Sequence, residues 1–353
     1  ADGSVGSPHV RVGHRQAFFY ERSVPLVGSE RFFMGSFMFA EINQALALVR
    51  KNGWISTSDW PLGAEISPSE VDLTESAGRL FRASPADEMD AEKLQQLARS
   101  AGLEFDIECC SVIDSTNRLL MQRFQIEAST VRLVVCDYQS SGRGRRGRQW
   151  ISPYARSLAF SYARDSKKSL HELGGLSCVV GLAVTDVLSE LGITDAGLKW
   201  PNDVWLEGGK LAGILVELAR RGPNTAVIIG VGINLALKPE ERESVDQPVV
   251  DLRSLGVTID RNNLLMKFLP KLVAYLDRFE KYGFEAFMQA FDAAHLMHQR
   301  EVVIHAAGSQ KSILTRGRAV GIGRSGQLWI ETEKGLEEIL GGEVSLRPAN
   351  PKE

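Results

Sequence analysis

Two kinds of hydrophobic pattern alternate through the middle of this chain of 353 residues. Between about residues 104 and 300, short runs rich in β-branched residues are separated by stretches with apolar positions at helical spacing. The runs predict strands and the helical spacing predicts helices. We expect strands at 105–113, 131–138, 157–162, 210–218 and 226–234, and helices at 115–125, 170–191, 261–280 and 284–296. This order predicts an α/β domain of catalytic size.

The pattern changes after residue 300 to closely spaced short strands separated by glycine-rich turns. We expect these strands at 302–305, 312–322, 327–332, 335–340 and 343–346. So many short strands in a short segment predict a small antiparallel barrel attached to the main domain.

The first part of the chain carries a weaker pattern. Residues 1–38 have no usable periodicity, so we expect an extension with little order. Helical spacing at 39–51 ends at Gly53, the stretch 53–85 is rich in Ser, Pro, Gly and Asp, and helical spacing returns at 90–100. The predicted organisation is an extension at 1–38, an N-terminal region at 39–85, a catalytic domain at 86–300 and a barrel at 301–353.

Composition and charge exclude several classes of protein. The chain has 41 Lys and Arg against 44 Asp and Glu, a net charge of −3, and 44% of its residues are apolar. This balance is typical of a globular protein and argues against a nucleic-acid-binding surface over the whole chain, while a local basic patch stays open. Apolar runs such as 226–231 are far shorter than the roughly 20 residues that cross a bilayer, and no secretory signal is visible, so we expect no membrane partner. The four cysteines lack metal-binding spacing, which favours reduced thiols in the cytoplasm.

The most informative segment is 141–150, directly after an expected strand. Its glycines let a ligand approach the backbone, and its arginines offer planar forks that match phosphate or carboxylate oxygens. These arginines are Arg143, Arg145, Arg146 and Arg148. Arginine-glycine tracts that contact nucleic acid are usually long and repeated, whereas this one is single, so the pattern favours a small anionic ligand.

Two further segments carry lysines, tryptophans and turn residues. Residues 199–205 contain a strong turn signal at Pro201, Asn202 and Asp203, and a second glycine turn leads into 210–217. Lys199 and Lys210 therefore bracket one hairpin. An ordinary surface hairpin and a binding site both explain these residues, since binding groups concentrate on loops held by rigid elements.

Two shorter motifs are weaker on their own. The turn 114–117 begins an expected helix, and Asp114 or Ser115 there is explained best as a helix cap. The stretch 230–234 contains a Gly-x-Gly pair at the end of an apolar strand but lacks the third glycine of a dinucleotide fingerprint. A Rossmann site is therefore disfavoured.

Taken together in order and spacing, these motifs resemble those of bacterial biotin–protein ligases, whose members often double as repressors of the biotin operon. The motifs lie at 114–117, 139 with 142–148, 199–203, 210–217 and 230–234, and the resemblance covers about residues 78–349. It implies an α/β (α+β) mixed-sheet core similar to class II synthetase-like folds, a C-terminal SH3-like β-barrel and a small N-terminal region related to a winged helix. It also implies that biotin and Mg·ATP give biotinyl-5′-adenylate, from which biotin passes to a lysine of a biotin carboxyl carrier protein, an acetyl-CoA carboxylase subunit.

The resemblance also assigns residues to the site. Those implied to bind biotin are Ser115, Thr116, Asn117, Gln139, Arg143, Gly144, Arg145 and Lys210. Those implied to bind the nucleotide are Arg148, Asn202, Asp203 and Asn234, and those implied to be catalytic are Arg145, Arg148 and Lys210. No protein ligands for a metal are implied, because Mg²⁺ arrives with ATP.

Two departures from the family pattern matter. Val249 stands where some members carry a tryptophan that caps the adenine. Repressor members carry a winged helix-turn-helix before the equivalent of 78–85, but here residues 54–77 contain no Lys or Arg and no long helical pattern. The sequence therefore favours a ligase and disfavours a DNA operator as partner; a bifunctional ligase and repressor is the alternative, and a homodimer stays open.

Overall fold

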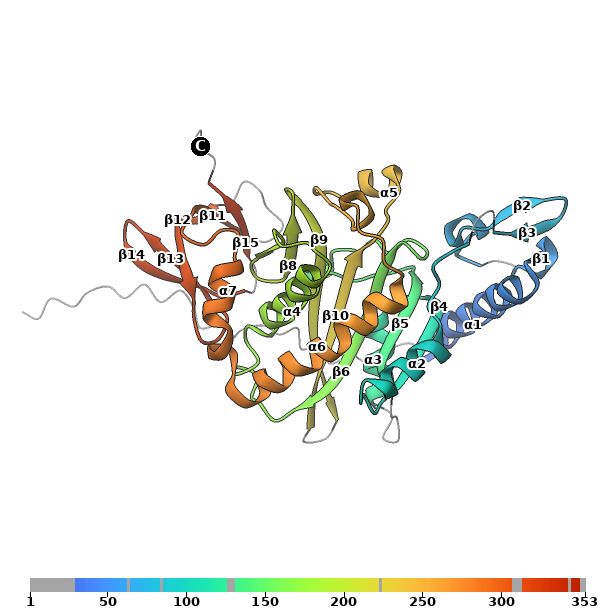
Figure 1. The fold of residues 1–353 in the computed structure, drawn as a ribbon, viewed down its shortest axis with the longest axis horizontal. Helices are drawn as coiled ribbons and strands as arrows, with labels where there is room; N and C mark the ends of the chain where they lie inside the picture. Colours follow the sequence, from blue (N-terminus) through green and yellow to red (C-terminus); the bar gives the residue numbers. More distant parts are fainter. Residues whose placement is uncertain are drawn as a thin grey trace, which may run out of the picture.

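The computed structural model describes residues 29–61, 64–82, 85–125, 131–221, 224–306, 313–341 and 344–349. Its centre is a seven-stranded mixed sheet with the order β4-β5-β6-β10-β9-β8-β7 (Figure 1). The strands are β4 Asp106–Ile113, β5 Val131–Gln139, β6 Ser157–Ser166, β7 Gly197–Lys199, β8 Asp203–Leu206, β9 Gly209–Arg221 and β10 Asn224–Asn234. Only the pair β4 and β5 is parallel among these neighbours. The predicted mixed-sheet α/β core is confirmed.

Helices cover both faces of this sheet because successive strand residues point to opposite sides. Leu133 and Val135 of β5 pack into the large core beneath α2 Ala91–Ser100, α4 Leu176–Glu190 and α6 Arg261–Tyr282. Figure 1 shows α4 and α6 crossing in front of the sheet. Val134, which points the other way, packs into a smaller core with Leu120 of α3 Thr116–Gln125. The strand β5 is therefore buried on both faces.

Two predicted helices differ in their bounds. Residues 170–175 form turns, and α4 begins only after Gly175, whose φ of 77° lies in the left-handed region. The expected helix at 284–296 divides into a 3₁₀ turn, η5 Phe284–Phe287, and a short helix, α7 Met288–Ala294. It ends there because His295 is extended, with φ −75° and ψ 115°.

The C-terminal domain is a five-stranded antiparallel sheet with the order β14-β13-β12-β11-β15. Its strands are β11 Glu301–Ala306, β12 Ile313–Ile322, β13 Leu328–Thr332, β14 Gly335–Ile339 and β15 Val344–Pro348. All five were predicted within a few residues. The Trp200 indole N–H donates to the Gly326 carbonyl (3.0 Å), which ties this domain to the turn between β7 and β8.

The N-terminal unit, defined here as residues 29–82, was predicted less well. Helix α1 Ser29–Asn52 begins ten residues before the helix expected at 39–51, and residues 1–28 of the expected extension lie outside the described residues. The apolar residues of α1 favour no one face strongly, which weakens the sequence signal. The expected irregular stretch contains three very short strands, β1 Trp54–Ser56, β2 Thr74–Ser76 and β3 Arg79–Phe81, paired in the order β1-β3-β2.

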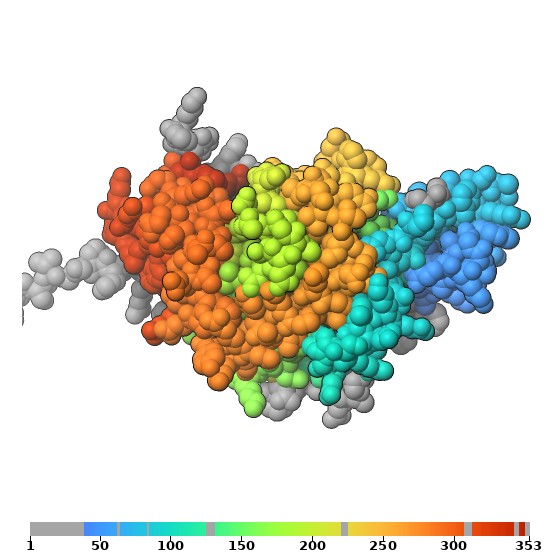
Figure 2. Space-filling model, in the orientation of Figure 1, coloured from blue at the N-terminus to red at the C-terminus, as the bar shows by residue number. Residues whose placement is uncertain are grey.

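The N-terminal unit packs directly on the main domain. Ile42 and Leu46 of α1 share one hydrophobic core with Val112 of β4 and with Tyr154. Asn43 adds two hydrogen bonds to the Val112 backbone, at 3.0 and 2.8 Å. Figure 2 shows the part of the N-terminal unit after residue 38 in shades of blue and the C-terminal domain in orange to red, at opposite ends of the molecule. Within the described ranges, no helix combines the length and apolar character needed to cross a membrane.

Candidate functional site

A cavity of about 1130 Å³ opens at one edge of the central sheet. At this edge the carboxyl ends of β4, β5 and β10 meet the amino ends of β6 and β9. Its walls come from the N-terminus of α3, the segment 141–150 (called the arginine loop), the β7–β8 turn, residues 244–249 and the C-terminal sheet. The topology therefore gathers the five sequence motifs around one cavity.

Glycines of β9 and β10 form the floor of the cavity. Gly232 pairs with Gly213 across the two strands. A Cβ atom on Gly232 would lie 2.3 Å from the Trp150 ring, and one on Gly230 would lie 2.4 Å from Asn117 Oδ1. Any larger residue at these two positions would displace these side chains. The Gly-x-Gly motif therefore leaves room for Asn117 and Trp150 above the sheet and does not serve as a dinucleotide phosphate site.

One end of the cavity is a network of buried polar groups in which the Glu217 carboxylate is paired with Arg143. The Thr116 backbone N–H donates to Gln139 Oε1 (3.0 Å), and Asn117 Nδ2 donates to Glu217 Oε2 (2.9 Å). The Ser161 hydroxyl donates to Thr116 Oγ1 (2.7 Å). Ser115, which lines the same end, is 2% exposed. This end can present donors and acceptors to a polar, uncharged group.

Arg143 lies at this polar end and forms an ion pair with Glu217. Its guanidinium donates twice to the Glu217 carboxylate, from Nη1 (3.2 Å) and from Nη2 (2.8 Å). Glu217 is 8% exposed, so the bidentate contact satisfies a buried charge. Arg143 therefore stabilises the polar end, and its implied contact with biotin stays a prediction. Glu217 and Ser161 were not selected from the sequence.

The other end of the cavity is cationic. Lys210 Nζ lies 2.8 Å from Asp203 Oδ1 and 5.5 Å from the centre of the Trp150 ring. Lys199 Nζ lies 3.9 Å from the centre of the Trp205 ring, and burial lowers the pKa of Lys199. A desolvated ammonium group gains most from an anionic ligand, so this end suits phosphate or carboxylate oxygens.

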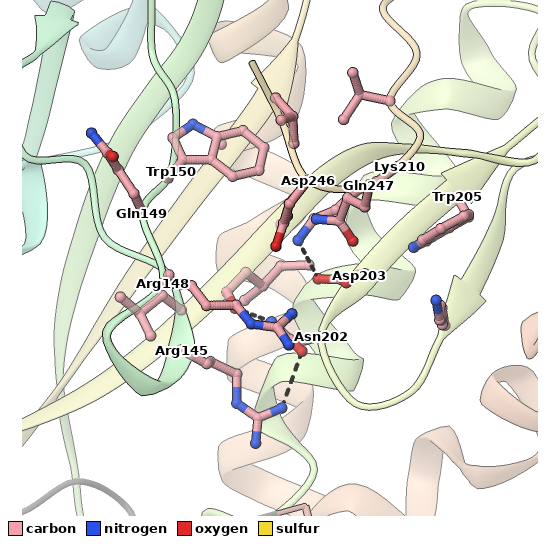
Figure 3. A pocket seen from close by; sticks show the side chains of 18 of the residues that line it. Arg145, Arg148, Gln149, Trp150, Asn202, Asp203, Trp205, Lys210, Asp246 and Gln247 are labelled. Atoms are coloured by element: carbon pink, nitrogen blue, oxygen red, sulfur yellow. Dashed lines mark hydrogen bonds and ion pairs between the residues drawn. The ribbon is translucent and has the colours of Figure 1, made fainter. Parts of the chain in front are cut away.

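The arginine loop faces this cationic end, as Figure 3 shows. Arg145 Nη1 donates to Asn202 Oδ1 (3.1 Å) and its Nη2 donates to the Gly341 carbonyl of the C-terminal domain. Burial lowers the pKa of Arg145. The Gly144 N–H donates to the Arg148 carbonyl (2.7 Å) across a tight turn. The exposed Arg148 side chain lines the cavity and pairs with no carboxylate of the described residues.

Asn234 supports the cavity wall. It is 3% exposed, and its Nδ2 donates to the Lys210 and Val250 carbonyls, each at 3.2 Å. The amide thus joins the end of β10 to β9 and to the segment that contains Val249. A direct contact between Asn234 and a nucleotide stays a prediction.

Two tryptophans in the cavity wall were part of sequence motifs but were not selected as site residues. Trp150 ends the arginine loop and lies on the glycine floor, and Trp205 lies in β8. Neither indole N–H has a hydrogen-bond partner in the part of the chain that the structure describes. Both can therefore contact a ligand through a ring face and an N–H group. Their position beside glycine-rich motifs was the available signal.

Comparisons with known proteins agree with this geometry. Residues 109–234 match the Biotin/lipoate A/B protein ligase family, and residues 304–347 match the Biotin protein ligase C terminal domain. The first match spans the floor of the cavity and those of its walls that precede residue 235. The second supports the predicted SH3-like domain.

Individual relatives extend the similarity to most of the chain. The Bifunctional ligase/repressor BirA of Salmonella typhimurium is 34% identical over 266 residues, which cover 75% of this chain and 80% of that protein. The Biotin--[acetyl-CoA-carboxylase] ligase of Paracoccus denitrificans is 33% identical over 218 residues, covering 60% and 88%. The solved structure of biotin protein ligase from Aquifex aeolicus in complex with biotin and ATP is 31% identical, covers 69% of this chain and 99% of that chain, and gives a TM-score of 0.58. On this identity and coverage, the chain belongs to the biotin protein ligase family.

Proposed function

We propose that this chain joins biotin to a protein lysine in two ATP-dependent steps, through biotinyl-5′-adenylate. The observation that carries the proposal is the division of one cavity into a neutral polar end around Asn117 and a cationic end around Lys210. Biotin has a neutral ureido head and a carboxylate tail, and this division matches both groups. The relative solved with biotin and ATP supports the same assignment.

In the first step, a biotin carboxylate oxygen attacks the α-phosphorus of ATP. The new bond joins that oxygen to phosphorus, the bond between the α-phosphorus and the bridging oxygen breaks, and pyrophosphate leaves. Two anions must approach each other, so cations that stay with the charge as it moves stabilise the transition state. Lys210 is assigned to the carboxylate, and Arg145 and Arg148 are assigned to the phosphate.

In the second step, an unprotonated lysine amine of the acceptor protein attacks the carbonyl carbon of the adenylate. The amide bond forms, the bond from that carbon to the phosphate oxygen breaks, AMP leaves and the amine loses a proton. Thr116, Asn117 and Gln139 are assigned to holding the ureido head in both steps. Asn202 and Asp203 are assigned to the nucleotide side.

We infer that Mg²⁺ enters with ATP. Asp203 is a carboxylate at the cationic end, and it is already paired with Lys210. Across the described ranges, no group of three His, Cys, Asp or Glu side chains is placed to hold a metal ion. When bound, Mg²⁺ would neutralise phosphate charge.

The acceptor is assigned as the biotin carboxyl carrier protein of acetyl-CoA carboxylase. The name of the Paracoccus denitrificans relative supports this choice. The four unpaired cysteines favour the cytoplasm as the place of reaction. Association of two chains stays a prediction of the family resemblance.

The proposed function predicts biotin-dependent exchange of labelled pyrophosphate into ATP. Exchange reports the reversible first step and requires the carboxylate, so biotin methyl ester should give none. Addition of a biotin carrier domain should then yield one biotinylated lysine per domain. A purified chain that exchanges no pyrophosphate with biotin, ATP and Mg²⁺ present would contradict the proposal.

Repression of a biotin operon is the second candidate function, because relatives include bifunctional ligase/repressors. Several observations argue for weak DNA binding. Between β1 and β2, the described residues contain only two 3₁₀ turns, η1 Thr57–Asp59 and η2 Pro68–Val71, and no helix long enough to enter a major groove. Arg50, one of two cations at the end of α1, bonds to Glu88 (2.5 Å) and Ser111 (3.2 Å) of the main domain.

We therefore expect no tight operator binding. The measurement is a titration of the chain with a biotin-operator duplex at saturating biotin and ATP. A salt concentration of about 0.15 M screens long-range attraction to the DNA. The preference over a scrambled duplex should be below about tenfold, whereas specific readers reach roughly a thousandfold or more. A thousandfold preference would show that the chain reads DNA and would restore the bifunctional alternative.

A further inference from the structure

Four charged side chains form an ionic cluster where the N-terminal unit meets the main domain. They are Asp72, Arg156, Lys238 and Glu241. Arg156 Nη2 lies 2.5 Å from Asp72 Oδ2, and Arg156 Nε lies 3.2 Å from Glu241 Oε1. Lys238 Nζ lies 3.3 Å from Asp72 Oδ1. Each side chain is partly shielded, and shared contacts of this kind hold better than an isolated surface pair.

Asp72 is presented to this cluster by a fixed turn of the N-terminal unit. It follows the 3₁₀ turn η2 with a left-handed backbone (φ 58°), and its N–H donates to the Ser69 carbonyl (3.1 Å). Its neighbours Val71 and Leu73 are buried in the core shared with α1. The carboxylate is therefore held by a packed unit and not by a free loop.

On the other side of the cluster lies the segment 235–251, which follows β10. The Arg156 carbonyl accepts hydrogen bonds from the N–H groups of Leu235 and Ala236, both at 3.0 Å. Lys238 and Glu241 belong to the short helix α5 Pro239–Glu243 and its cap. The cluster thus fixes the first part of this segment.

The second part of the same segment is a wall of the cavity. Residues 244–249 line it, and Figure 3 shows Asp246 and Gln247 beside Lys210. The Lys210 N–H donates to the Pro248 carbonyl (2.9 Å), and the Val250 N–H donates to the Lys210 carbonyl (3.1 Å). A continuous path of contacts therefore leads from Asp72 to the strand that carries Lys210.

We propose that Asp72 is a positioning residue, through which the N-terminal unit holds residues 244–249 against the nucleotide end of the cavity. The inference rests on the proposed ligase function and gives the N-terminal unit a part in that reaction which needs no DNA. The wall contacts Lys210 and Asn234. The polar end lies at the other end of the cavity, where Asn117 lies over Gly230. Loosening the wall should affect ATP more than biotin.

The test is Asp72→Asn in the full chain. Asn keeps the shape and tolerates the left-handed backbone, while the charge that holds Arg156 and Lys238 is lost. The KM for ATP in pyrophosphate exchange should rise roughly threefold to tenfold, the range expected when one contact in a coupling network is removed. The KM for biotin should rise less than the KM for ATP, because the wall contacts Lys210 only through its backbone, and kcat should stay unchanged. Glu75→Gln is the matched control, because Glu75 is an exposed carboxylate in β2 of the same unit, and it should match the wild type.

The outcomes separate this inference from the proposed function. An unchanged KM for ATP in Asp72→Asn would overturn the inference while leaving ligation intact. Equal changes in both KM values with a lower unfolding midpoint would also overturn it, because they would show a purely structural role. If the wild type catalyses no exchange, the ligase proposal fails, and the rise in unfolding midpoint caused by ATP becomes the readout. That rise should still be smaller in Asp72→Asn than in Glu75→Gln.

Discussion

Replacing Lys210 by alanine should slow the formation of biotinyl adenylate by roughly 30-fold to 4,000-fold, equivalent to about 2 to 5 kcal/mol for a buried charged contact. The Lys210 side chain is 13% exposed and lies beside Asp203 at the cationic end. Its removal takes away the cation nearest the expected carboxylate and also leaves Asp203 unpaired. A carboxylate without its ammonium partner would repel both anionic substrates. The measurement is kcat/KM for biotin in pyrophosphate exchange.

Two further variants show where that loss comes from. Lys210→Ala combined with Asp203→Asn should recover part of the rate, because the repelling charge is gone. Lys271→Ala is a matched control: Lys271 pairs with Glu190 (2.6 Å), and its helix α6 covers the face of the sheet opposite the glycine floor. It should leave exchange unchanged. Wild-type kinetics in Lys210→Ala would remove this residue from the site.

The sequence predicted the long elements of the fold because they repeat a pattern over many residues. The strands β9 and β10 are 13 and 11 residues long and showed clear apolar runs. In contrast, β7 and β8 span three and four residues, too few for a period of two to emerge. The sheet of the N-terminal unit was not predicted from the sequence for the same reason, because each of its strands has three residues. Its pairing depends on contacts with α1 and β4 that no local pattern records.

The site was predicted as a set of motifs, but its pairings were not. Asn117 and Glu217 are 100 positions apart and meet only because α3 lies across β9 and β10. Ser161 lies inside an apolar strand, and nothing in its neighbours marks it. The arginine loop looked like one anion-binding unit, yet Arg143 binds Glu217 while Arg145 binds Asn202. Residue type predicted the chemistry, and the topology assigns each side chain its partner.

The largest effect on stability should come from Arg261, which is fully buried at the start of α6. Its Nη1 lies 2.7 Å from Asp137 Oδ1, and Asp137 also accepts the Met89 N–H (2.9 Å). The same guanidinium donates to the Asp87 carbonyl (2.8 Å), so it joins the linker after the N-terminal unit to β5. Arg261→Ala leaves the buried Asp137 carboxylate with only the longer ion pair to Arg50 (3.5 Å), which should lower the free energy of unfolding by about 3 to 5 kcal/mol.

Replacing both partners separates this penalty from simple loss of contacts. Arg261→Met with Asp137→Leu should recover part of the stability, because no buried charge is left without a partner. The recovery should be incomplete, since the carbonyls of Asp87 and Cys136 also lose the donors that Arg261 supplies. Arg318→Ala is the matched control: its ion pair with Glu331 is about half exposed, and such pairs contribute at most about 1 kcal/mol. Urea unfolding curves measure all three. If Arg261→Ala is no less stable than the double variant, the charge left on Asp137 is not what destabilises the fold.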